Sequence, residues 1–337
     1  MDYLKFFIDG EWVDPSTPAT IDVINPATEK SCAQISAGSP EDVDRAVSAA
    51  RDAFTSYSRW SVQQRLELLE KIRATYKDYF DDIAQAISDE MGAPIDLARG
   101  SQAKLGHGHI KSAIKALLNF PFETVEDDMI LRYEPIGVCG MITPWNWPMN
   151  QVAVKVMPAL AAGCTMVLKP SEESPLDAMI FTEVLREAGV PAGVFNLVNG
   201  DGEGVGSQLS AHPDVDMISF TGSTRAGKAI SRAAAETLKR VSLELGGKGA
   251  NIVFADAPDG AVKRGARSCF NNTGQSCNAP TRMLVERSIY DEAVEIARET
   301  AEKTAVGSAH EEGRHIGPLV SERQFDRVQA LIQKGVE

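Results

Sequence analysis

The sequence predicts an α/β fold built on a doubly wound parallel sheet. Between Gly137 and Leu245, short apolar runs alternate with segments that have helical periodicity and capping residues. Five runs have the length and composition of buried strands: "GVCGMI", "CTMVLK", "GVFNLV", "DMISF" and "RVSLEL". Such alternation indicates a parallel sheet with helices on both faces and with ligands at the carboxyl ends of its strands.

The segments before this sheet are predicted to be strands followed by packing helices. "FFIDGEWV" and "TIDVINP" are typical of short strands. A helix is expected after Ser39, with Pro40 at its first position. A second helix is expected after Ser61, where Gln64 completes a capping box, and its apolar periodicity continues without a break to Gly92.

A third helix is predicted over "PIDLARGSQAKLGHGHIKSAIKALLNF", residues 94–120. It contains His107 and His109, which are two positions apart and therefore do not share a helix face. Solvation or local hydrogen bonds are expected for both histidines, and no metal site is predicted.

A second α/β unit is predicted after Gly247. "ANIVFAD" has the pattern of a strand, a helix is expected from about Pro258, and the polar loop "NNTGQSCNAP" follows. "RMLVE" and "SIYDEAVEIARET" then continue the unit as strand and helix. We therefore predict two domains, residues 1–246 and 247–337.

The composition excludes several classes of protein. The 337 residues carry a net charge of -13 with the charges scattered, so there is no basic footprint for nucleic acid. No apolar run approaches the length of a membrane span. The odd number and irregular spacing of the cysteines argue against disulfides and against a zinc site, and a reducing, cytoplasmic location is expected; these cysteines are Cys32, Cys139, Cys164, Cys269 and Cys277.

Cys277 is the first candidate for chemistry. It lies among small polar residues, whereas a cysteine that only packs is usually buried among apolar ones. A free thiol has a pKa of roughly 8.5, so a nucleophilic role needs donors or positive charge nearby. From the loop alone, a nucleophile and an inert loop thiol are equally compatible with the sequence.

Two further side chains are candidates for the same chemistry. Glu244 lies between leucines in "LELGGK", where burial would raise its pKa and suit it to act as a general base; the alternative is an exposed strand end. Asn146, in "TPWNWP", follows a predicted strand and could donate to a developing oxyanion, or it could simply cap the next helix.

Three other motifs are suited to a nucleotide. Lys169 and Glu172 follow a predicted strand in "LKPSEESP" and could bind the hydroxyl groups of a ribose. "SFTGSTRAG" and "NGDGEGVG" place small residues at strand-to-helix turns, where free backbone amides suit a phosphate, although neither motif is specific by itself; the residues concerned are Gly222, Ser223 and Gly227 in the first and Gly202 and Gly206 in the second.

Together these motifs resemble the NAD(P)-dependent aldehyde dehydrogenase superfamily. "TPWNWP", "LKPSE", "FTGST", "LELGGK" and "GQSC" occur in the family's order, and the likeness runs from "FIDGEWV" to the last residue. The resemblance implies a Rossmann-like NAD domain and a catalytic domain. It also implies that an aldehyde is oxidised to a carboxylic acid through a cysteine thiohemiacetal and a thioester.

The resemblance assigns roles to the candidate residues. Cys277 matches the nucleophile, Asn146 and the Cys277 amide match the oxyanion site, and Glu244 matches the base that activates water. NAD is the implied cofactor, with NADP possible, and Glu172 would disfavour a 2′-phosphate. The residues matched to cofactor binding are Ile142, Trp145, Lys169, Glu172, Gly202, Gly206, Gly222, Ser223, Leu245 and Gly246.

The resemblance also bears on substrate and assembly. The side chains matched to the aldehyde tunnel suggest an apolar or aromatic aldehyde; they are Trp147, Gln151, Val154, Ser276 and Asn278. A β-rich excursion near residues 121–137 matches a bridging or oligomerisation element, and full-length family members are expected to be homo-oligomers.

Family chains continue beyond the end of this one, through a Glu-x-Phe-Gly-Pro motif. The second domain is therefore expected to be incomplete, and this chain to be weakly active, prone to associate and without the family's oligomer. Two alternatives remain open: a nucleotide-binding remnant without turnover, and a coenzyme A-acylating relative, which Glu244 disfavours because such relatives generally lack this acid.

Overall fold

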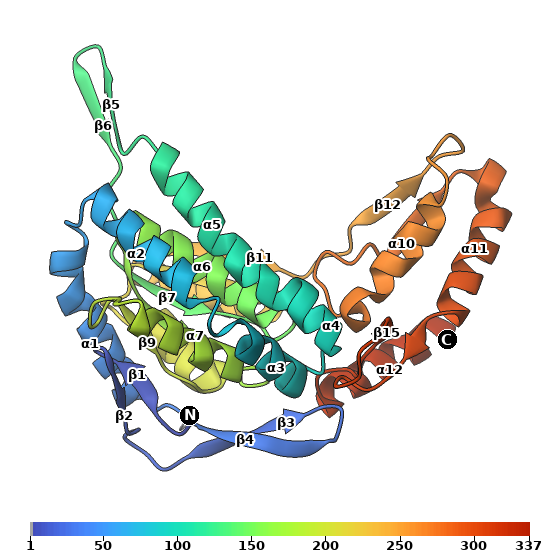
Figure 1. The fold of residues 1–337 in the computed structure, drawn as a ribbon, viewed down its shortest axis with the longest axis horizontal. Coiled ribbons are helices and arrows are strands. Elements are labelled where there is room, and N and C mark those ends of the chain that lie inside the picture. The colour runs from blue at the N-terminus through green and yellow to red at the C-terminus, as the bar shows by residue number, and fades with distance from the viewer. Residues whose placement is uncertain (1–2) are drawn as a thin grey trace.

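The computed structural model describes residues 3–337 and is centred on a seven-stranded sheet (Figure 1). The strand order is β11-β10-β7-β8-β9-β1-β2, in which the strands from β11 to β9 are parallel and β1 and β2 add an antiparallel edge. All five predicted strands are present. The bounds are β1 (Phe6–Ile8), β2 (Glu11–Val13), β7 (Val138–Ile142), β8 (Thr165–Lys169), β9 (Phe195–Leu197), β10 (Met217–Gly222) and β11 (Arg240–Leu245).

Helices cover both faces of the sheet, which confirms the doubly wound prediction. Alternate residues of β7 point to opposite faces: Cys139 and Met141 join one apolar cluster, and Val138 and Ile142 join another. The first face is covered by helices α2 (Val62–Thr75), α3 (Phe80–Met91), α5 (Lys104–Asn119), α6 (Pro148–Ala162) and α7 (Leu176–Glu187). The second is covered by α1 (Pro40–Tyr57), α8 (Ser207–Ala211), which follows the π-helical turn η2 (Gly202–Gly206), and α9 (Thr224–Ala235).

Strand β11 differs from its prediction. The sequence "RVSLEL" predicts a buried strand, but β11 forms the edge of the sheet and its residues alternate between exposed and half-buried. Within residues 3–337, strand β11 is paired with β10 on one side and with no strand on the other. Helix α9 covers one of its two faces. A short apolar run does not reveal whether its strand is central or at the edge, and that is why the prediction failed.

The second predicted helix is two helices, α2 (Val62–Thr75) and α3 (Phe80–Met91). Tight turns end α2, where Lys77 N donates to Ala74 O and Asp78 N to Thr75 O. The fully buried Tyr76 donates its hydroxyl to Ala103 O at 2.7 Å, which fixes the break. The predicted capping boxes of α1 and α2 are both present, and Gly92 ends α3 with a φ of 74°.

The third predicted helix is also divided. It consists of α4 (Ile95–Leu97), a π-helical segment η1 (Ala98–Ala103) and α5 (Lys104–Asn119). His109 Nε2 lies 2.7 Å from Asn150 Oδ1, and the ring of His107 stacks on Tyr76. The expected local hydrogen bonds are not found, because the partner of His109 is 41 positions away and His107 Nε2 is buried without a hydrogen-bond partner in the described part of the chain.

Two hairpins stand outside the central sheet. One is formed by β3 (Thr20–Asn25) and β4 (Lys30–Ser36). The other, β5 (Glu123–Glu126) and β6 (Met129–Arg132), corresponds to the predicted β-rich excursion and projects beyond the end of α5 (Figure 1). Its apolar side chains Val125, Met129 and Ile130 are exposed.

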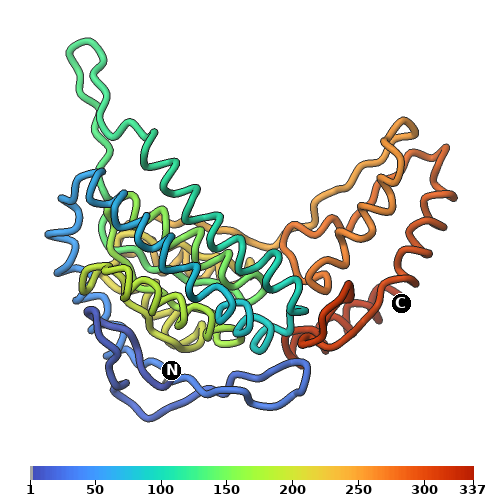
Figure 2. The backbone as a smooth tube through the Cα atoms, in the orientation of Figure 1, coloured from blue at the N-terminus to red at the C-terminus, as the bar shows by residue number. Residues whose placement is uncertain are grey.

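The part of the chain from Ala250 onward forms a separate arm (Figure 2). Parallel strands β12 (Ala250–Val253) and β13 (Arg282–Val285) pack against α10 (Ala261–Phe270) and α11 (Tyr290–Glu302), as predicted. Short turns η3 (Asn271–Gly274) and η4 (Arg287–Ile289), the strand pair β14 (Ala305–Val306) and β15 (His315–Ile316), and α12 (Glu322–Val336) complete it. The arm joins the rest near α4 and β15, where Ile95 N donates to Ala309 O at 2.8 Å.

Among residues 3–337, no helix combines the length and the apolar composition needed to cross a membrane.

Candidate functional site

Most of the predicted cofactor residues lie along one edge of the sheet. Because β7, β8, β10 and β11 are parallel, their final residues Ile142, Lys169, Gly222 and Leu245 share the carboxyl edge. Trp145 is half-buried just beyond β7, and Gly246 is exposed beyond β11 with open space around its Cα. The fold thus assembles residues that are about a hundred positions apart in the chain.

Lys169 is the most buried charge at this edge. Its Nζ donates to Pro170 O at 2.8 Å and to Gly200 O at 2.7 Å, and lies 3.4 Å from Glu172 Oε2. Burial lowers the pKa of Lys169, and the Glu172 carboxylate opposes that change. Glu172 keeps 29% of its side chain exposed, so the pair presents its acidic member to solvent.

Two glycine-containing turns complete the edge. Ser223 caps α9, with its Oγ accepting from Ala226 N at 3.2 Å. Gly227 allows α9 to pack on β11, because a Cβ at this position would lie 2.8 Å from Leu245 Cδ2. In η2, Gly206 is buried, and no atom lies within 4 Å of a Cβ built on Gly202. Open space therefore lies beside Gly202, whereas the turn before α9 is closely packed, since a Cβ on Gly222 would lie 2.5 Å from Phe220 Cζ.

Cys277 is exposed in the loop formed by residues 271–281, which includes η3 and ends at β13; we call it the Cys277 loop. This loop is hydrogen-bonded to the segment that follows β7: Trp147 Nε1 donates to Ser276 Oγ at 2.8 Å, and Asn272 Nδ2 donates to Asn146 O at 2.7 Å. The structure therefore places the two predicted catalytic residues Asn146 and Cys277 in directly bonded segments.

The loop adopts an unusual backbone. Asn272 and Thr273 have φ values of 53° and 57°, and Gly274 follows with 74°. For a β-branched residue such as Thr273 this conformation is strained, and strain of this kind persists only where surrounding contacts enforce it. Thr273 Oγ1 donates to Gly317 O, and Val320 N donates to Gln275 Oε1, so the loop is also anchored from the far side.

The burial predicted for Glu244 is wrong. The residue is exposed on the edge strand β11, and in the described part of the chain it makes no hydrogen bond to Cys277 or Asn146. It interacts electrostatically with Lys155 of α6, whose Nζ donates to Ser219 Oγ at 3.0 Å. Burial lowers the pKa of Lys155 to about 8, and Glu244 opposes that change.

Sequence reasoning missed three polar residues at this site. Lys155 stands alone among apolar residues in "QVAVKVMP", a signal that could have found it. Gln102 and Asn272 are both buried and hydrogen-bonded to each other. The sequence around each of these two residues does not indicate that they are paired, because 170 positions separate them in the chain.

The side chains predicted to line an aldehyde tunnel are unequally placed. Trp147, Gln151 and Ser276 are half-buried, whereas Val154 and Asn278 are exposed. Within residues 3–337, no group of three or more His, Cys, Asp and Glu side chains is placed to hold a metal ion.

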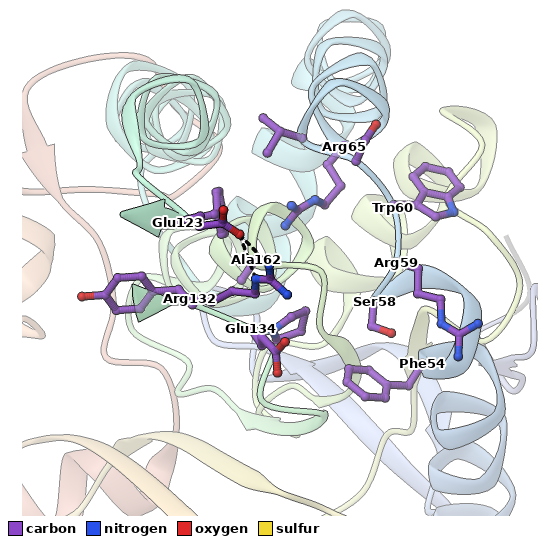
Figure 3. Close-up of a pocket in the computed structure, with 14 residues that line it drawn as sticks. Phe54, Ser58, Arg59, Trp60, Arg65, Glu123, Arg132, Glu134 and Ala162 are labelled. Carbon is purple, nitrogen blue, oxygen red and sulfur yellow. Dashed lines mark hydrogen bonds and ion pairs between the residues drawn. The ribbon is translucent and has the colours of Figure 1, made fainter. Parts of the chain in front are cut away.

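A pocket of about 560 Å³ lies away from these residues, between α2 and the base of the β5–β6 hairpin (Figure 3). Arg65 extends into it from α2, lies over the Phe122 ring and donates from Nη1 to Ala161 O at 2.6 Å. That bond satisfies a carbonyl at the end of α6, so the buried guanidinium has a structural role as a helix cap.

Comparison with known proteins adds a family relationship. Residues 12–337 match the sequence model of the family described as "Aldehyde dehydrogenase family". The chain is 54% identical to 3-succinoylsemialdehyde-pyridine dehydrogenase of a Pseudomonas species, with 99% of this chain and 71% of that protein covered. It is 47% identical to a putative aldehyde dehydrogenase of Staphylococcus aureus, with 100% and 71% covered.

Solved structures agree with the sequence matches. An aldehyde dehydrogenase from Bartonella henselae superposes with a TM-score of 0.97 at 59% identity, over 99% of this chain and 71% of that one. A cysteine-to-alanine mutant of aldehyde dehydrogenase C from Pseudomonas syringae, in complex with NAD+ and octanal, gives a TM-score of 0.98 at 49% identity, over 99% and 69%.

Proposed function

The chain belongs to the aldehyde dehydrogenase family, and from this premise we propose that it oxidises an aldehyde to a carboxylic acid with NAD(P)+ through a thioester on Cys277. The observation that carries the proposal is the bonding of the Cys277 loop to the Asn146–Trp147 segment at the carboxyl edge of the sheet. This bonding supports a site in which Cys277 would act as nucleophile and Asn146 as oxyanion donor beside a nucleotide.

The residues at the sheet edge fit a dinucleotide. Lys169 and Glu172 would hold a ribose, and the start of α9 at Ser223 would receive the pyrophosphate, since its first backbone amides have no helical carbonyl partners. NAD+ would supply the hydride acceptor. Two structural relatives, from Pseudomonas syringae and Bacillus cereus, are described as NAD+ complexes, and the half-buried Glu172 carboxylate favours NAD over NADP.

The protein's own groups account for the first step. The Cys277 thiolate forms a carbon–sulfur bond to the aldehyde carbon, and the carbonyl electrons move to oxygen. Asn146 Oδ1 accepts from Trp147 N at 3.1 Å, which orients the side-chain amide and leaves its Nδ2 available to donate to that oxyanion. The product is a thiohemiacetal, and its tetrahedral carbon is one from which hydride can leave.

Hydrolysis of the thioester needs a base and water. Glu244 is exposed on β11, so its carboxylate can reach solvent water and can act on it as a general base. Proton transfer from water to Glu244 would generate the hydroxide that attacks the thioester and releases the Cys277 thiolate. The presence of this acid disfavours a coenzyme A-acylating reaction.

We propose an apolar or aromatic aldehyde as substrate. The half-buried Trp147 lies next to the Cys277 loop and offers an apolar wall. The Pseudomonas syringae relative is described with octanal, and the Pseudomonas relative is named for a pyridine semialdehyde. We also propose the division into a nucleotide-binding part, residues 1–246, and a catalytic part, residues 247–337.

The test compares wild type, Cys277→Ala and Cys269→Ala with NAD+ and octanal, following NADH absorbance. Cys277→Ala should lower the turnover rate by at least about a thousandfold, because it removes the nucleophile. Cys269 is the matched control: it lies in the same part of the chain and is half-buried, with its Sγ donating to Pro280 O, so its loss should leave turnover near that of wild type. Equal rates for all three proteins would refute the proposal.

Replacing Glu244 by Gln separates the two half-reactions. The variant should release a burst of NADH about equal to the enzyme concentration and then turn over slowly, because the thioester forms but is not hydrolysed. A steady rate equal to that of wild type would remove Glu244 from the mechanism while leaving the role of Cys277 intact.

A further inference from the structure

Gln102 is a fully buried amide that connects the helical layer to the Cys277 loop. Its Nε2 donates to Asn272 Oδ1 at 3.1 Å and lies 3.5 Å from Met91 Sδ, while its Oε1 is buried without a partner. A buried polar atom left unsatisfied costs stability. The position of Gln102 is therefore not explained by the stability of the core alone.

The hydrogen bonds of Asn272 fix the orientation of both amides. Asn272 Nδ2 faces two backbone carbonyl oxygens, Asn146 O at 2.7 Å and Gln275 O at 3.4 Å, and a carbonyl can only accept. Asn272 Oδ1 must therefore face Gln102, and Gln102 must present its NH2 group. Only a side chain that donates at this point satisfies the network.

Gln102 reaches this point from the π-helical segment η1. A π-helical turn changes the angular position of the side chains that follow, and such turns are frequent at functional sites. The turn is held by the Tyr76 hydroxyl, which donates to Ala103 O at 2.7 Å. The position of Gln102 is thus set by the packed core and not by the loop that it contacts.

The loop needs such support. Asn272 is 3% exposed and, with Thr273, lies in the left-handed region at φ values of 53° and 57°. We propose that Gln102 is a positioning residue: by holding Asn272, it holds the Cys277 loop and the Asn146 segment in their relative places. The expected effect of Gln102 on turnover rests on the proposed function, whereas its effect on the order of the Cys277 loop does not.

The main test is Gln102→Met in the whole chain. Methionine has a similar volume and suits the contact with Met91. It leaves Asn272 Oδ1 without its donor but also removes the unsatisfied Oε1, so these two effects offset each other and the denaturation midpoint should change little. Hydrogen exchange at residues 271–279 should become about tenfold faster, the loss expected when one buried hydrogen bond is removed, with exchange in β7 and β8 unchanged. Unchanged exchange in the loop would overturn the inference.

Asn196→Leu is the matched control. Asn196 is also fully buried, and its amide donates to Met166 O and Gly193 O and accepts from Asp9 N, all away from the Cys277 loop. Its replacement should lower overall stability without selectively loosening residues 271–279. Selective loosening of the loop in this control would mean that loop exchange reports general destabilisation, and would count against the proposal.

A double-mutant cycle and kinetics complete the test. In an Asn272→Ala background, Gln102→Met should add almost no further loop exchange; independent, additive effects would contradict the link. With octanal and NAD+, Gln102→Met should lower kcat about tenfold while the KM for NAD+ stays within about twofold. If wild type itself oxidises no aldehyde, the proposed function fails, whereas the exchange result still decides the role of Gln102.

Discussion

The part of the chain up to Leu245 and the arm from Ala250 onward differ sharply in packing. Every residue of β7 and β8 is buried, whereas β12 and β13 together bury only Val253, and no residue of α12 is buried. The first part has large apolar clusters on both faces of its sheet, and the arm has a cluster of three buried residues, Val253, Val262 and Ala293.

This difference explains how the proposed nucleophile is positioned. Cys277 belongs to the thinly packed arm, which has little core of its own to hold a strained loop. The loop is instead bonded to Asn146, Trp147 and Gln102 of the well-packed part. A well-packed scaffold thus positions a residue carried by a loop, which is a common way to build a site.

The largest expected effect comes from comparing the same substitution in both parts. Ile87→Ala, in a fully buried position of α3, should cost about 2–5 kcal/mol of unfolding free energy. Ile296→Ala, at a half-buried position of α11, should cost about half as much. Part of the Ile296 side chain is exposed to water in the folded protein, so its removal loses less buried apolar surface.

Urea denaturation measures both losses. All four tryptophans lie before residue 150, so their fluorescence reports on the first part, while far-UV circular dichroism reports on the helices of both. Ile296→Ala should move the circular dichroism transition more than the fluorescence transition. Equal shifts in both signals would mean that the two parts unfold as one unit despite their different packing.

An intermediate effect is expected at a buried carboxyl pair in the first part. Glu90 accepts from Leu176 N and Asp177 N at the start of α7, while both carboxyl oxygens of Asp177 are buried without partners. Burial raises the pKa of Asp177 to about 7, and burial next to Asp177 also raises the pKa of Glu90. The folded protein therefore keeps protons that the unfolded chain loses near pH 4.

The stability contributed by Asp177 should fall as the pH rises. Because the folded pKa of Asp177 is raised, its contribution to stability is complete below about pH 4 and is lost as the pH rises through about 7. Asp177→Asn should therefore be about 1–3 kcal/mol more stable than wild type at pH 8 and nearly equal to it at pH 4. Urea titrations at both pH values provide the check, and a difference that does not depend on pH would rule out this ionisation.

The smallest effect on stability is expected on α12. Phe325, Leu331 and Ile332 expose 51%, 60% and 57% of their surface, so charging them removes few contacts. Leu331→Lys with Ile332→Lys should change the unfolding free energy by no more than about 0.5 kcal/mol while reducing self-association. Gln329→Lys with Gln333→Lys adds the same charge on the same helix and is the control in sedimentation velocity. If both pairs reduce association equally, net charge rather than the apolar face is responsible.

Much of the first part follows from local sequence. The strands from Gly137 to Leu245, the capping boxes at Ser39 and Ser61, and the end of α3 at Gly92 were all predictable from periodicity and capping, because neighbouring residues determine these features. The break between α2 and α3 was not, since the apolar periodicity continues across it and the anchor, Tyr76 on Ala103, is a tertiary contact.

For the site, the sequence by itself determined which residues are candidates. Cys277, Glu244, Asn146 and Lys169 carry their chemistry in their residue types and in the motifs around them. The tertiary structure decided their surroundings. It placed Glu244 on an exposed edge strand, buried Lys169 against backbone carbonyls, and joined Gln102 to Asn272 across 170 positions. Burial and hydrogen bonding depend on tertiary contacts between segments that are distant in the chain, and local sequence propensity does not determine those contacts.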